Sequence, residues 1–403
     1  MAKAKIITGL DIGSSSIKAL LVKKKCGEED LEVLGCFQEI SAGIRRGVVI
    51  NVSKVAEIIS SVLKKAQNES GQKINSVYTN IGGAHLYCTS SHGLVSVSRA
   101  DQKISEEDIA RVLEAAQTFS LPSNKEILEV FPKEFIVDGE GGIKEVLGLQ
   151  GVRLETEVLV LCGFAPYLKN LTQAVLNSGF QINDLVAAPL ASARAVLTPR
   201  EKELGVALLD IGAGTTGFAA YEEGTLIHTA IFPIGSGHIT NDIAICLKTD
   251  IDTAERIKLE FGSCLPSKSE KSEKQIRITA EEPLVFSKKM LVEITEARVS
   301  EIFDQCQKEL KKISRHGLLP AGIVLTGGGA RLPKIKELCK KELKLPCRIG
   351  LPQGFFPPQE DPSLAAVSGL VLGGADLETE RRLFLPERGI GAKLKRIFKI
   401  FIP

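Results

Sequence analysis

Asp11-Ile-Gly-Ser-Ser-Ser-Ile-Lys18 and Asp210-Ile-Gly-Ala-Gly-Thr-Thr216 are two versions of one short pattern, in different parts of the same chain. Each follows an apolar run, Ile6 to Leu10 in the first case and Val206 to Leu209 in the second, and each precedes another strand-like run. The pattern therefore predicts a strand, a tight turn rich in Gly, Ser and Thr, and a returning strand, twice in one chain.

Turns of this composition suit phosphate groups, because glycine lets backbone N–H groups approach an anion closely and the hydroxyls add further donors. The aspartate that opens each turn is poorly placed to touch phosphate. It is well placed to hold the water shell of Mg²⁺, an ion that keeps several waters while it bridges phosphates. Two such turns that face each other would hold a nucleotide between two halves of the chain.

Two other nucleotide motifs are excluded. Gly212-Ala-Gly-Thr-Thr-Gly217 fits the G-x-G-x-x-G dinucleotide fingerprint, but that fingerprint needs a helix to begin inside the motif. Here a strand-like run, Phe218 to Tyr221, and a turn, Glu222 to Gly224, follow instead. A P-loop sequence, G-x-x-x-x-G-K-[ST], does not occur in the chain.

Composition sets the broad class. The chain has 403 residues, enough for two domains, and its net charge of +2 gives no argument for nucleic acid as a partner. Its nine cysteines form no C-x-x-C pair, which favours reduced thiols in the core. The first apolar run ends at Asp11, too early for a signal peptide, and no run approaches about 18 apolar residues. We expect a soluble cytoplasmic body whose membrane contact, if any, comes from an attached surface segment.

Hydrophobic periodicity outlines the elements inside each half. It predicts helices over 52–67, capped by Asn51 or Ser53, and over 288–313, and a strand over 322–325 that ends at three glycines. Between residues 83 and 163 lies a region of different texture, which we expect to be a compact α+β insert. Its expected elements are strands at 86–89, 94–97, 127–130 and 156–161 and a helix capped by Ser105 with Asp108.

Two helices of small residues close the halves, at 191–197 and 364–373. Small residues recur every four positions, as Ala191 and Ala195 in one helix and as Ala365, Gly369 and Gly373 in the other. Each helix therefore has one smooth face. Such faces allow two helices to cross closely, as at a hinge, although ordinary packing explains them equally well.

The segment 389–403 differs from everything before it. Its apolar residues fall on one helical face and its basic residues on the other, the composition of a helix that lies in the headgroup plane of an anionic membrane. The alternative is a terminal helix docked on the protein itself. The predicted membrane-contacting residues are Ile390, Leu394, Lys395, Arg396, Ile397, Phe398, Lys399 and Phe401.

The paired turns, the glycine-rich strand end and the small-residue helices together resemble the actin-like ATPase superfamily. Four further stretches narrow the resemblance to the FtsA family of bacterial cell-division proteins. They are Ile44-Arg-Arg-Gly-Val-Val-Ile-Asn51, Asn80-Ile-Gly-Gly-Ala-His85, Pro233-Ile-Gly-Ser-Gly-His-Ile-Thr-Asn-Asp242 and Ala254-Glu-Arg-Ile-Lys258. The resemblance covers essentially the whole chain.

The resemblance implies an α/β actin-like fold with two duplicated ribonuclease-H-like halves, a nucleotide cleft between them and an FtsA-type α+β insert in the first half. The implied divisions are 1–84 with 163–195 for the first half, 85–162 for the insert, 196–225 with 300–375 for the second half, 226–299 for its upper subdomain, 376–388 for a linker and 389–403 for the membrane helix.

The resemblance also implies the site. Asp11 and Asp210 would lie over Mg²⁺, and the glycines 327–329 would lie against adenosine. The residues implied at ATP are Gly13, Ser14, Ser15, Ser16, Lys18, Gly212, Ala213, Gly214, Thr215, Thr216, Gly235, Gly237, Asp242, Glu255, Lys258, Gly327, Gly328 and Gly329.

By the same resemblance the protein would be an adaptor at the cytoplasmic face of the inner membrane, at the division septum. It would tether filaments of the tubulin-like FtsZ, whose carboxy-terminal tail would bind the upper subdomain. It would also assemble with itself and contact later division proteins through the insert.

One departure concerns hydrolysis. Actin-fold members that hydrolyse ATP readily carry a Glu or Gln that orients the attacking water near the end of the first half, where this chain reads Val186-Ala-Ala-Pro-Leu190. We therefore expect ATP binding with weak or no turnover. Two alternatives remain: an actin-fold small-molecule kinase, and a cytoplasmic assembly protein like PilM. Membrane binding through 389–402 would separate the adaptor from both.

Overall fold

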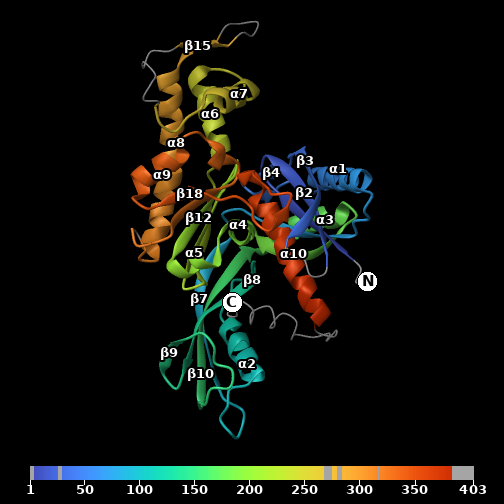
Figure 1. Ribbon diagram of the computed structural model, residues 1–403, viewed down its shortest axis with the longest axis vertical. Helices are drawn as coiled ribbons and strands as arrows, with labels where there is room; N and C mark the ends of the chain where they lie inside the picture. The colour runs from blue at the N-terminus through green and yellow to red at the C-terminus, as the bar shows by residue number, and fades with distance from the viewer. Residues whose placement is uncertain (1–3, 26–29, 267–274, 279–283, 316, 384–403) are drawn as a thin grey trace.

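The computed structural model describes residues 4–25, 30–266, 275–278, 284–315 and 317–383. Two β-sheets and their helices form the middle of an elongated molecule (Figure 1). The helices α6 (Ser236–Leu247), α7 (Ile251–Phe261) and α8 (Lys288–Lys312) extend from one end, and the four-stranded sheet of the insert, with α2 (Glu106–Gln117), extends from the other. No helix in these ranges is long and apolar enough to cross a membrane.

The first-half sheet has the order β11-β6-β1-β2-β3-β19. Strands β1 to β3 form an antiparallel meander, and β6 and β11 continue the sheet in parallel with β1. The first predicted turn joins β1 to β2, with Asp11 directly opposite Lys18. The strands are β1 (Lys5–Ile12), β2 (Ser16–Lys24), β3 (Leu31–Ile40), β6 (Ser76–Ile81), β11 (Gln181–Ala187) and β19 (Phe355–Phe356).

The second-half sheet repeats this plan in the order β14-β13-β12-β17-β18, with three antiparallel strands followed by two parallel ones. The second predicted turn joins β12 to β13, so both hairpins are confirmed. A strand and not a helix begins inside Gly212–Gly217, which confirms that this match to the fingerprint is not a dinucleotide-binding turn. The strands are β12 (Val206–Ile211), β13 (Thr216–Glu222), β14 (Thr225–Phe232), β17 (Gly322–Thr326) and β18 (Cys347–Ile349).

Both long helices predicted from periodicity are present. α1 spans Val52–Ser70, and of the two proposed caps Asn51 is the one that forms, since its side chain accepts a hydrogen bond from the Lys54 N–H. α8 spans Lys288–Lys312. The other helices of the two halves are α3 (Ala165–Asn177), α5 (Pro199–Leu204), α6 (Ser236–Leu247), α7 (Ile251–Phe261) and α9 (Ile335–Leu343), and the strands β15 (Gln275–Ile278) and β16 (Leu284–Ser287) pair beside α8.

The two small-residue helices exchange partners between the halves. α4 (Ala188–Val196) packs on the second-half strands β12 to β14, and α10 (Ala365–Leu383) packs on the first-half strands β1, β2 and β6. They cross where a Cβ added to Gly369 would lie 1.7 Å from the carbonyl oxygen of Ala191. The expected close crossing is confirmed, because no residue larger than glycine fits at position 369.

The insert is an α+β unit with a hydrophobic core of its own. Its sheet has the order β7-β10-β8-β9, and α2 (Glu106–Gln117) covers it. The predicted cap of α2 forms as a capping box between Ser105 and Asp108. The two short strands expected at 86–89 and 94–97 are one continuous strand, because β10 pairs with it along its whole length. The strands are β7 (Tyr87–Ser96), β8 (Lys125–Val137), β9 (Glu140–Ile143) and β10 (Arg153–Phe164).

Two expected boundaries differ from the structure. The charged stretch that begins at residue 376, expected to be a linker, continues α10 as far as Leu383, because Glu378 and Thr379 contact Lys5 and Lys24 of the first-half sheet. The upper subdomain, expected to begin at 226, begins after β14, which belongs to the central sheet. Residues 384–403, and with them every predicted membrane-contacting residue, lie outside the described residues.

Candidate functional site

The first turn holds its aspartate firmly. Asp11 ends β1 with only 7% of its surface exposed. Its Oδ1 accepts a hydrogen bond from Asn80 Nδ2 at 2.5 Å, and its Oδ2 lies 3.4 Å from Lys18 Nζ. The Asn80 Oδ1 in turn accepts the Ile12 N–H at 2.8 Å. Asn80 and Lys18, on the two strands beside β1, therefore fix the carboxylate at the end of the sheet.

The second turn surrounds its aspartate differently. Asp210 Oδ2 accepts a hydrogen bond from the Ser192 hydroxyl of α4 at 2.5 Å. The pKa of Asp210 is raised to about 6: burial raises it most, the Ser192 hydroxyl lowers it, the charge of Asp11 raises it and the charge of Lys18 lowers it. Each half thus contributes one carboxylate, at the turn that follows the first strand of its hairpin.

The backbones of the two turns meet. Each turn closes on itself by one hydrogen bond, from Gly13 N–H to Ser16 O and from Gly212 N–H to Thr215 O. A Cβ added to Gly214 would lie 2.7 Å from Ser14 Oγ, so the second turn can approach the first only because residue 214 is glycine. The two predicted phosphate-binding turns thus lie at one site, with Ala213, Thr215 and Ser15 in the same loops.

The start of α6 packs onto the second turn. The N–H groups of Ser236 and Gly237 donate to the carbonyl oxygens of Gly212 and Ala213 at 2.8 and 2.9 Å. A Cβ on Gly235 would lie 2.4 Å from the Gly212 oxygen, which explains the glycine at that position. Gly235 and Gly237 therefore support the second turn, and their contact with ATP stays a prediction.

The glycine-rich segment after β17 lies against the end of β12. Gly327 has φ +82, and a Cβ there would lie 2.3 Å from Asp210 Oδ1; a Cβ on Gly329 would lie 2.3 Å from Ile211 Cγ2. A Cβ on Gly328, in contrast, would meet only Ser363 Cβ, at 4.0 Å. Gly328 is therefore the position of the three where a flat group has room to approach the backbone.

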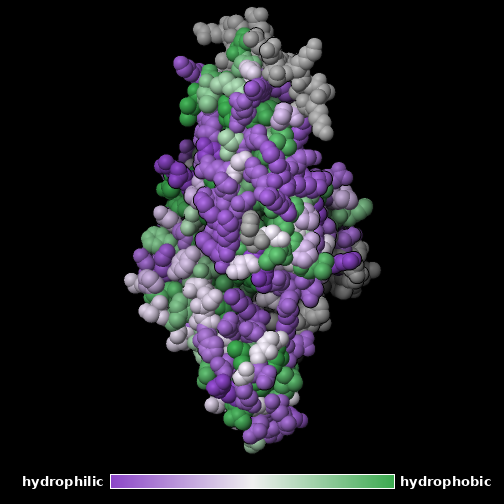
Figure 2. Space-filling model, turned by 90° about the vertical axis from the view of Figure 1, so that its left-hand side faces the viewer, coloured by the Kyte–Doolittle hydropathy of each residue, from purple (hydrophilic) through white to green (hydrophobic). Residues whose placement is uncertain are grey.

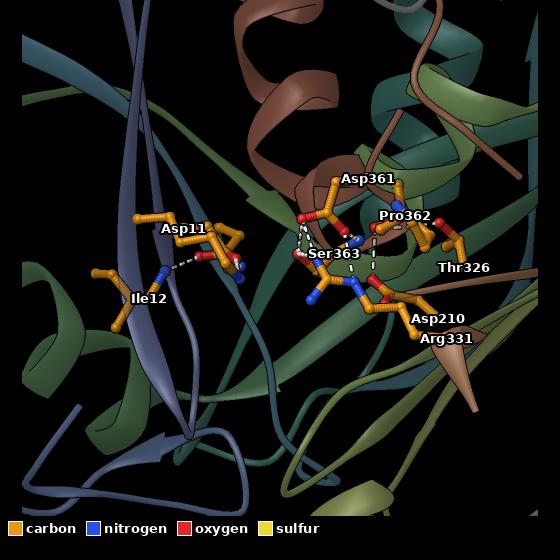
Figure 3. Close-up of polar contacts among 11 residues, drawn as sticks. Asp11, Ile12, Asp210, Thr326, Arg331, Asp361, Pro362 and Ser363 are labelled. Carbon is orange, nitrogen blue, oxygen red and sulfur yellow. Dashed lines mark hydrogen bonds and ion pairs between the residues drawn. The ribbon is translucent and has the colours of Figure 1, made fainter. Parts of the chain in front are cut away.

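An ion pair missed from the sequence follows this segment. Arg331 Nε donates to Asp361 Oδ1 at 2.9 Å, and the Asp361 carboxylate also accepts the Ser363 N–H at 2.9 Å. Figure 3 shows this cluster beside Asp210 and Thr326, with Asp11 and Ile12 to the left of it in the view. The two residues are 30 positions apart in sequence, and no local sequence pattern predicts their contact.

The two α7 residues predicted from the resemblance contact α6. Lys258, buried to 6% exposure, has its Nζ 2.6 Å from Glu255 Oε2 and 3.0 Å from Thr240 Oγ1 of α6. Lys258 also lies 3.4 Å from the carbonyl oxygen of Ser236, the residue that holds Gly212. The structure thus brings Glu255 and Lys258 to the second turn through α6.

Two predicted site residues have other roles. Asp242 forms a two-armed ion pair with Arg298 of α8, at 2.7 and 2.8 Å, and lines a groove on the surface between α6 and α8. Its placement in the cleft is therefore corrected. The Thr216 hydroxyl is fully buried and donates to Ile234 O at 2.8 Å, so it joins β13 to the segment before α6 and does not face the cleft.

The donor chemistry at the cleft fits a magnesium–phosphate group. Asp11 and Asp210 are the penultimate residues of corresponding strands, and a turn with hydroxyls and backbone N–H groups follows each. No group of three or more metal-ligating side chains occurs within the ranges that the structure covers. Asp11 and Asp210 would hold such an ion together with water and phosphate oxygens, the arrangement that Mg²⁺ prefers.

Two family profiles match parts of this chain. The sequence profile described as "Cell division protein FtsA" matches residues 207–369, and the profile of the "SHS2 domain inserted in FTSA" matches residues 83–162. The FtsA of Pseudomonas aeruginosa is 35% identical over 382 residues, covering 93% of this chain and 91% of the relative. The FtsA of Borreliella burgdorferi is 36% identical over 401 residues, covering 98% and 96%.

This chain belongs to the FtsA family. The Bacillus subtilis FtsA is also similar, 33% identical over 354 residues, which cover 87% of this chain and 80% of that FtsA. The predicted family membership is therefore confirmed, and the SHS2 profile falls on the insert described above.

Solved structures show the actin-like fold. A PilM–PilN type IV pilus biogenesis complex chain matches with a TM-score of 0.66 at 17% identity, over 91% of this chain and 98% of its own. MreB5 of Spiroplasma citri bound to ADP matches with a TM-score of 0.58 at 14% identity, over 94% and 98%. The predicted fold class is confirmed. The ADP in that MreB5 shows that an actin-like neighbour binds nucleotide.

Proposed function

We propose that this FtsA-family protein binds Mg–ATP between its two halves and acts as a membrane-attached adaptor of cell division. The observation that supports nucleotide binding is the direct contact between the Ser14 turn and the Gly214 turn, with Asp11 and Asp210 on the two sides. ATP would contact both turns, and it would therefore favour the closed arrangement of the halves.

Turnover in this proposal is weak or absent. The chain from Ala187 to Leu190 passes from β11 into α4 with apolar side chains, and Pro189 packs against Gly217 of the second hairpin. No side chain there can orient a water for attack on phosphate. A single-turnover measurement with radiolabelled ATP tests this. Phosphate release on the order of 1 s⁻¹ would contradict weak turnover.

The groove between α6 and α8 supports the proposed contact with the carboxy-terminal tail of FtsZ. It has a volume of about 290 Å³ and combines apolar surface with the charged pair Asp242–Arg298. Ile245 at its edge is 74% exposed. Figure 2 shows the left-hand side of the view in Figure 1, and hydrophobic residues lie near its upper end, the end that carries α6 and α7. An extended peptide with apolar and charged residues fits such a surface.

Fluorescence anisotropy with a labelled FtsZ tail peptide tests the groove. Ile245→Arg should weaken binding at least tenfold, because a charge replaces the apolar edge. Leu259→Arg is the matched control: Leu259 is also 74% exposed but lies on α7, and it does not line the groove. Equal weakening by both variants, or by neither, would contradict this site.

Attachment to the membrane rests on the sequence of residues 389–403. Co-sedimentation with anionic vesicles should pellet the full chain and leave a chain truncated after Arg388 in solution. Filaments of FtsZ should then reach vesicles only when the full chain is present. Pelleting of both chains, or of neither, would contradict the tether. Self-assembly and contacts of the insert with later division proteins belong to the same proposal and can be tested by electron microscopy and by pull-down with the insert deleted.

A further inference from the structure

The outer surface of α1 carries a groove that the proposed function does not use. Figure 1 shows α1 at the right-hand edge of the view, on the outside of the first half. The buried residues of α1 pack inward, and its opposite face is exposed. The groove on this face, between α1 and the end of α3, has a volume of about 530 Å³. It is lined by Ser53, Ala56, Glu57, Ser60, Ser61, Lys64 and Asn177.

Four of these residues form one straight stripe along α1. Ser53, Glu57, Ser60 and Lys64 follow one another at steps of four, three and four positions, and Gln67 continues the series after three more. Alternating steps of three and four keep residues on one face of an α-helix, and they are the spacing at which two helices pair. The stripe therefore has the spacing of a helix-pairing surface, with polar and charged side chains.

The stripe is nearly symmetric about Ser60. If a second α1 lies antiparallel on it, Glu57 of each copy meets Lys64 of the other, and Ser53 lies opposite Gln67. The arrangement forms two identical ion pairs related by a two-fold axis, and it places Ser60 opposite itself. A surface that is complementary to itself in this way is what a symmetric contact between two identical chains requires.

The two charged residues are available for this contact. Glu57 and Lys64 are exposed, and neither forms an ion pair within the described part of the chain. They are seven positions apart, about 10 Å along the helix axis, which is too far for them to pair with each other. A parallel arrangement would place Glu57 against Glu57 and Lys64 against Lys64, so repulsion between like charges opposes it. The charges therefore select the antiparallel arrangement.

We propose that a second copy of this chain docks on this groove, with the two α1 helices antiparallel. The contact deepens the self-assembly of the proposed function, on which it rests, by naming one surface through which two copies meet. A single helix face is smaller than the roughly 800 Å² per partner that a stable complex buries, so one contact alone is weak. Repeated between two rows of assembled chains, such contacts add up.

Cross-linking of the full chain through an introduced cysteine tests the pairing. Ser60→Cys places two thiols opposite each other across the two-fold axis, and a short bifunctional maleimide should then yield about tenfold more dimer than the unmodified chain. The unmodified chain reports the background from its own exposed thiols, Cys36 and Cys246. Ser53→Cys is the matched control in the same groove. In the antiparallel pair its two thiols lie about 20 Å apart, so its yield should stay at the background.

Exchange of charges supplies a second test, with each variant combined with Ser60→Cys. Glu57→Lys or Lys64→Glu alone replaces two attractions by two repulsions and should lower the dimer yield at least about fivefold. The double variant Glu57→Lys with Lys64→Glu exchanges the two charges and should recover the yield. A mixture of the two single variants should also form dimers, because each chain then supplies the charge that the other lacks.

Three results would overturn the pairing: a yield from Ser60→Cys at the background, equal yields from Ser60→Cys and Ser53→Cys, or a double charge variant that stays as low as the single variants. Electron microscopy of the same chains separates this contact from self-assembly in general. Filaments that form while the Ser60→Cys yield stays at the background overturn only the α1 contact. Absence of any assembly, with the yield at the background, overturns both.

Discussion

The first turn holds its aspartate with a lysine and an amide, whereas the second turn holds its aspartate with one hydroxyl. Lys18 and Asn80 contact Asp11, and Ser192 contacts Asp210, whose pKa is raised to about 6 by burial and by Asp11. The two hairpins have the same strand directions and the same closing hydrogen bond. The two hairpins therefore share a backbone arrangement but differ in the charges and hydrogen bonds around their aspartates.

This difference gives the carboxylates separate roles. Asp11 forms an ion pair with Lys18, while Asp210 is influenced by charges of both signs, since Asp11 raises its pKa and Lys18 lowers it. A divalent cation between them would stabilise the charged form of Asp210 most, because that carboxylate has most to gain from a positive charge. We therefore expect Asp210 of the second turn to make metal binding depend on pH. We expect the first turn to keep its geometry when no metal is bound.

The largest effect should come from exchanging residues between the turns. Gly214→Ser places a side chain where a Cβ alone would be 2.7 Å from Ser14 Oγ, so the turns must separate. ATP affinity should fall at least about 100-fold, on the order of 3 kcal/mol. Ser15→Gly, at the corresponding position of the first turn, keeps the backbone N–H and should weaken binding less than about tenfold. Calorimetric titration measures both, and equal losses would show that the turns do not meet.

Lys18→Met should make the first turn resemble the second. The methionine keeps the length of the side chain but removes the cation 3.4 Å from Asp11 Oδ2. Mg–ATP affinity should then fall by about tenfold at pH 6 and recover partly at pH 8, because Lys18 lowers the pKa of Asp210, and without it more of that carboxyl is protonated at pH 6. Titrations at the two pH values check this. A loss of the same size at both would mean that Lys18 acts on phosphate alone.

Asp210→Asn should stabilise the protein at high pH. The folded-state pKa of Asp210, about 6, lies above its ordinary value of 3.8, so its protonated form stabilises the fold and this contribution is lost as pH rises through 6. At pH 8 the asparagine removes the cost of the charged carboxylate, about 1 kcal/mol for a partly exposed side chain. Thermal unfolding should show a higher Tm for the variant at pH 8 and almost no difference at pH 4. A lower Tm at pH 8 would contradict the raised pKa.

Ser192→Ala should have the smallest effect. The serine hydroxyl is the hydrogen-bond donor that favours the charged form of Asp210, so its removal should raise the pKa of Asp210 further. Mg²⁺ dependence of ATP binding should weaken about threefold, close to 0.6 kcal/mol, with little change in unfolding. The metal titration at pH 7 is the measurement, and an unchanged midpoint would show that Ser192 has only a packing role.

Much of the fold could be predicted from local sequence patterns. The hairpins at Asp11 and Asp210, the caps at Asn51 and Ser105 and the smooth face around Gly369 depend on residues a few positions apart, so sequence alone predicts them. The long strand β7 was divided in the prediction because His92 and Gly93 interrupt its apolar run, and only pairing with β10 shows its continuity.

The partners of the site residues could not be predicted in this way. Asn80 reaches Asp11 because β6 runs parallel beside β1, and Ser192 reaches Asp210 because α4 crosses to the other sheet. Asp242 was placed in the cleft by its position in a family motif, whereas Arg298, 56 residues away, holds it on the surface. Such pairs follow from tertiary packing, which no short window of sequence contains.

The path of α10 has a mechanical consequence. The helix is fastened to the first-half sheet near its end, where Lys24 Nζ donates to Thr379 Oγ1 at 2.6 Å and to the carbonyl oxygen of Ala375 at 3.0 Å. At its other end it touches α4 through Gly369, at the crossing between the halves. With the proposed membrane segment following it in sequence, a pull on the anchored chain would load the first half directly. If this pull broke the contacts of Lys24, α10 would transmit the force to its crossing with α4. Force on the membrane segment would then change how the two halves close on each other.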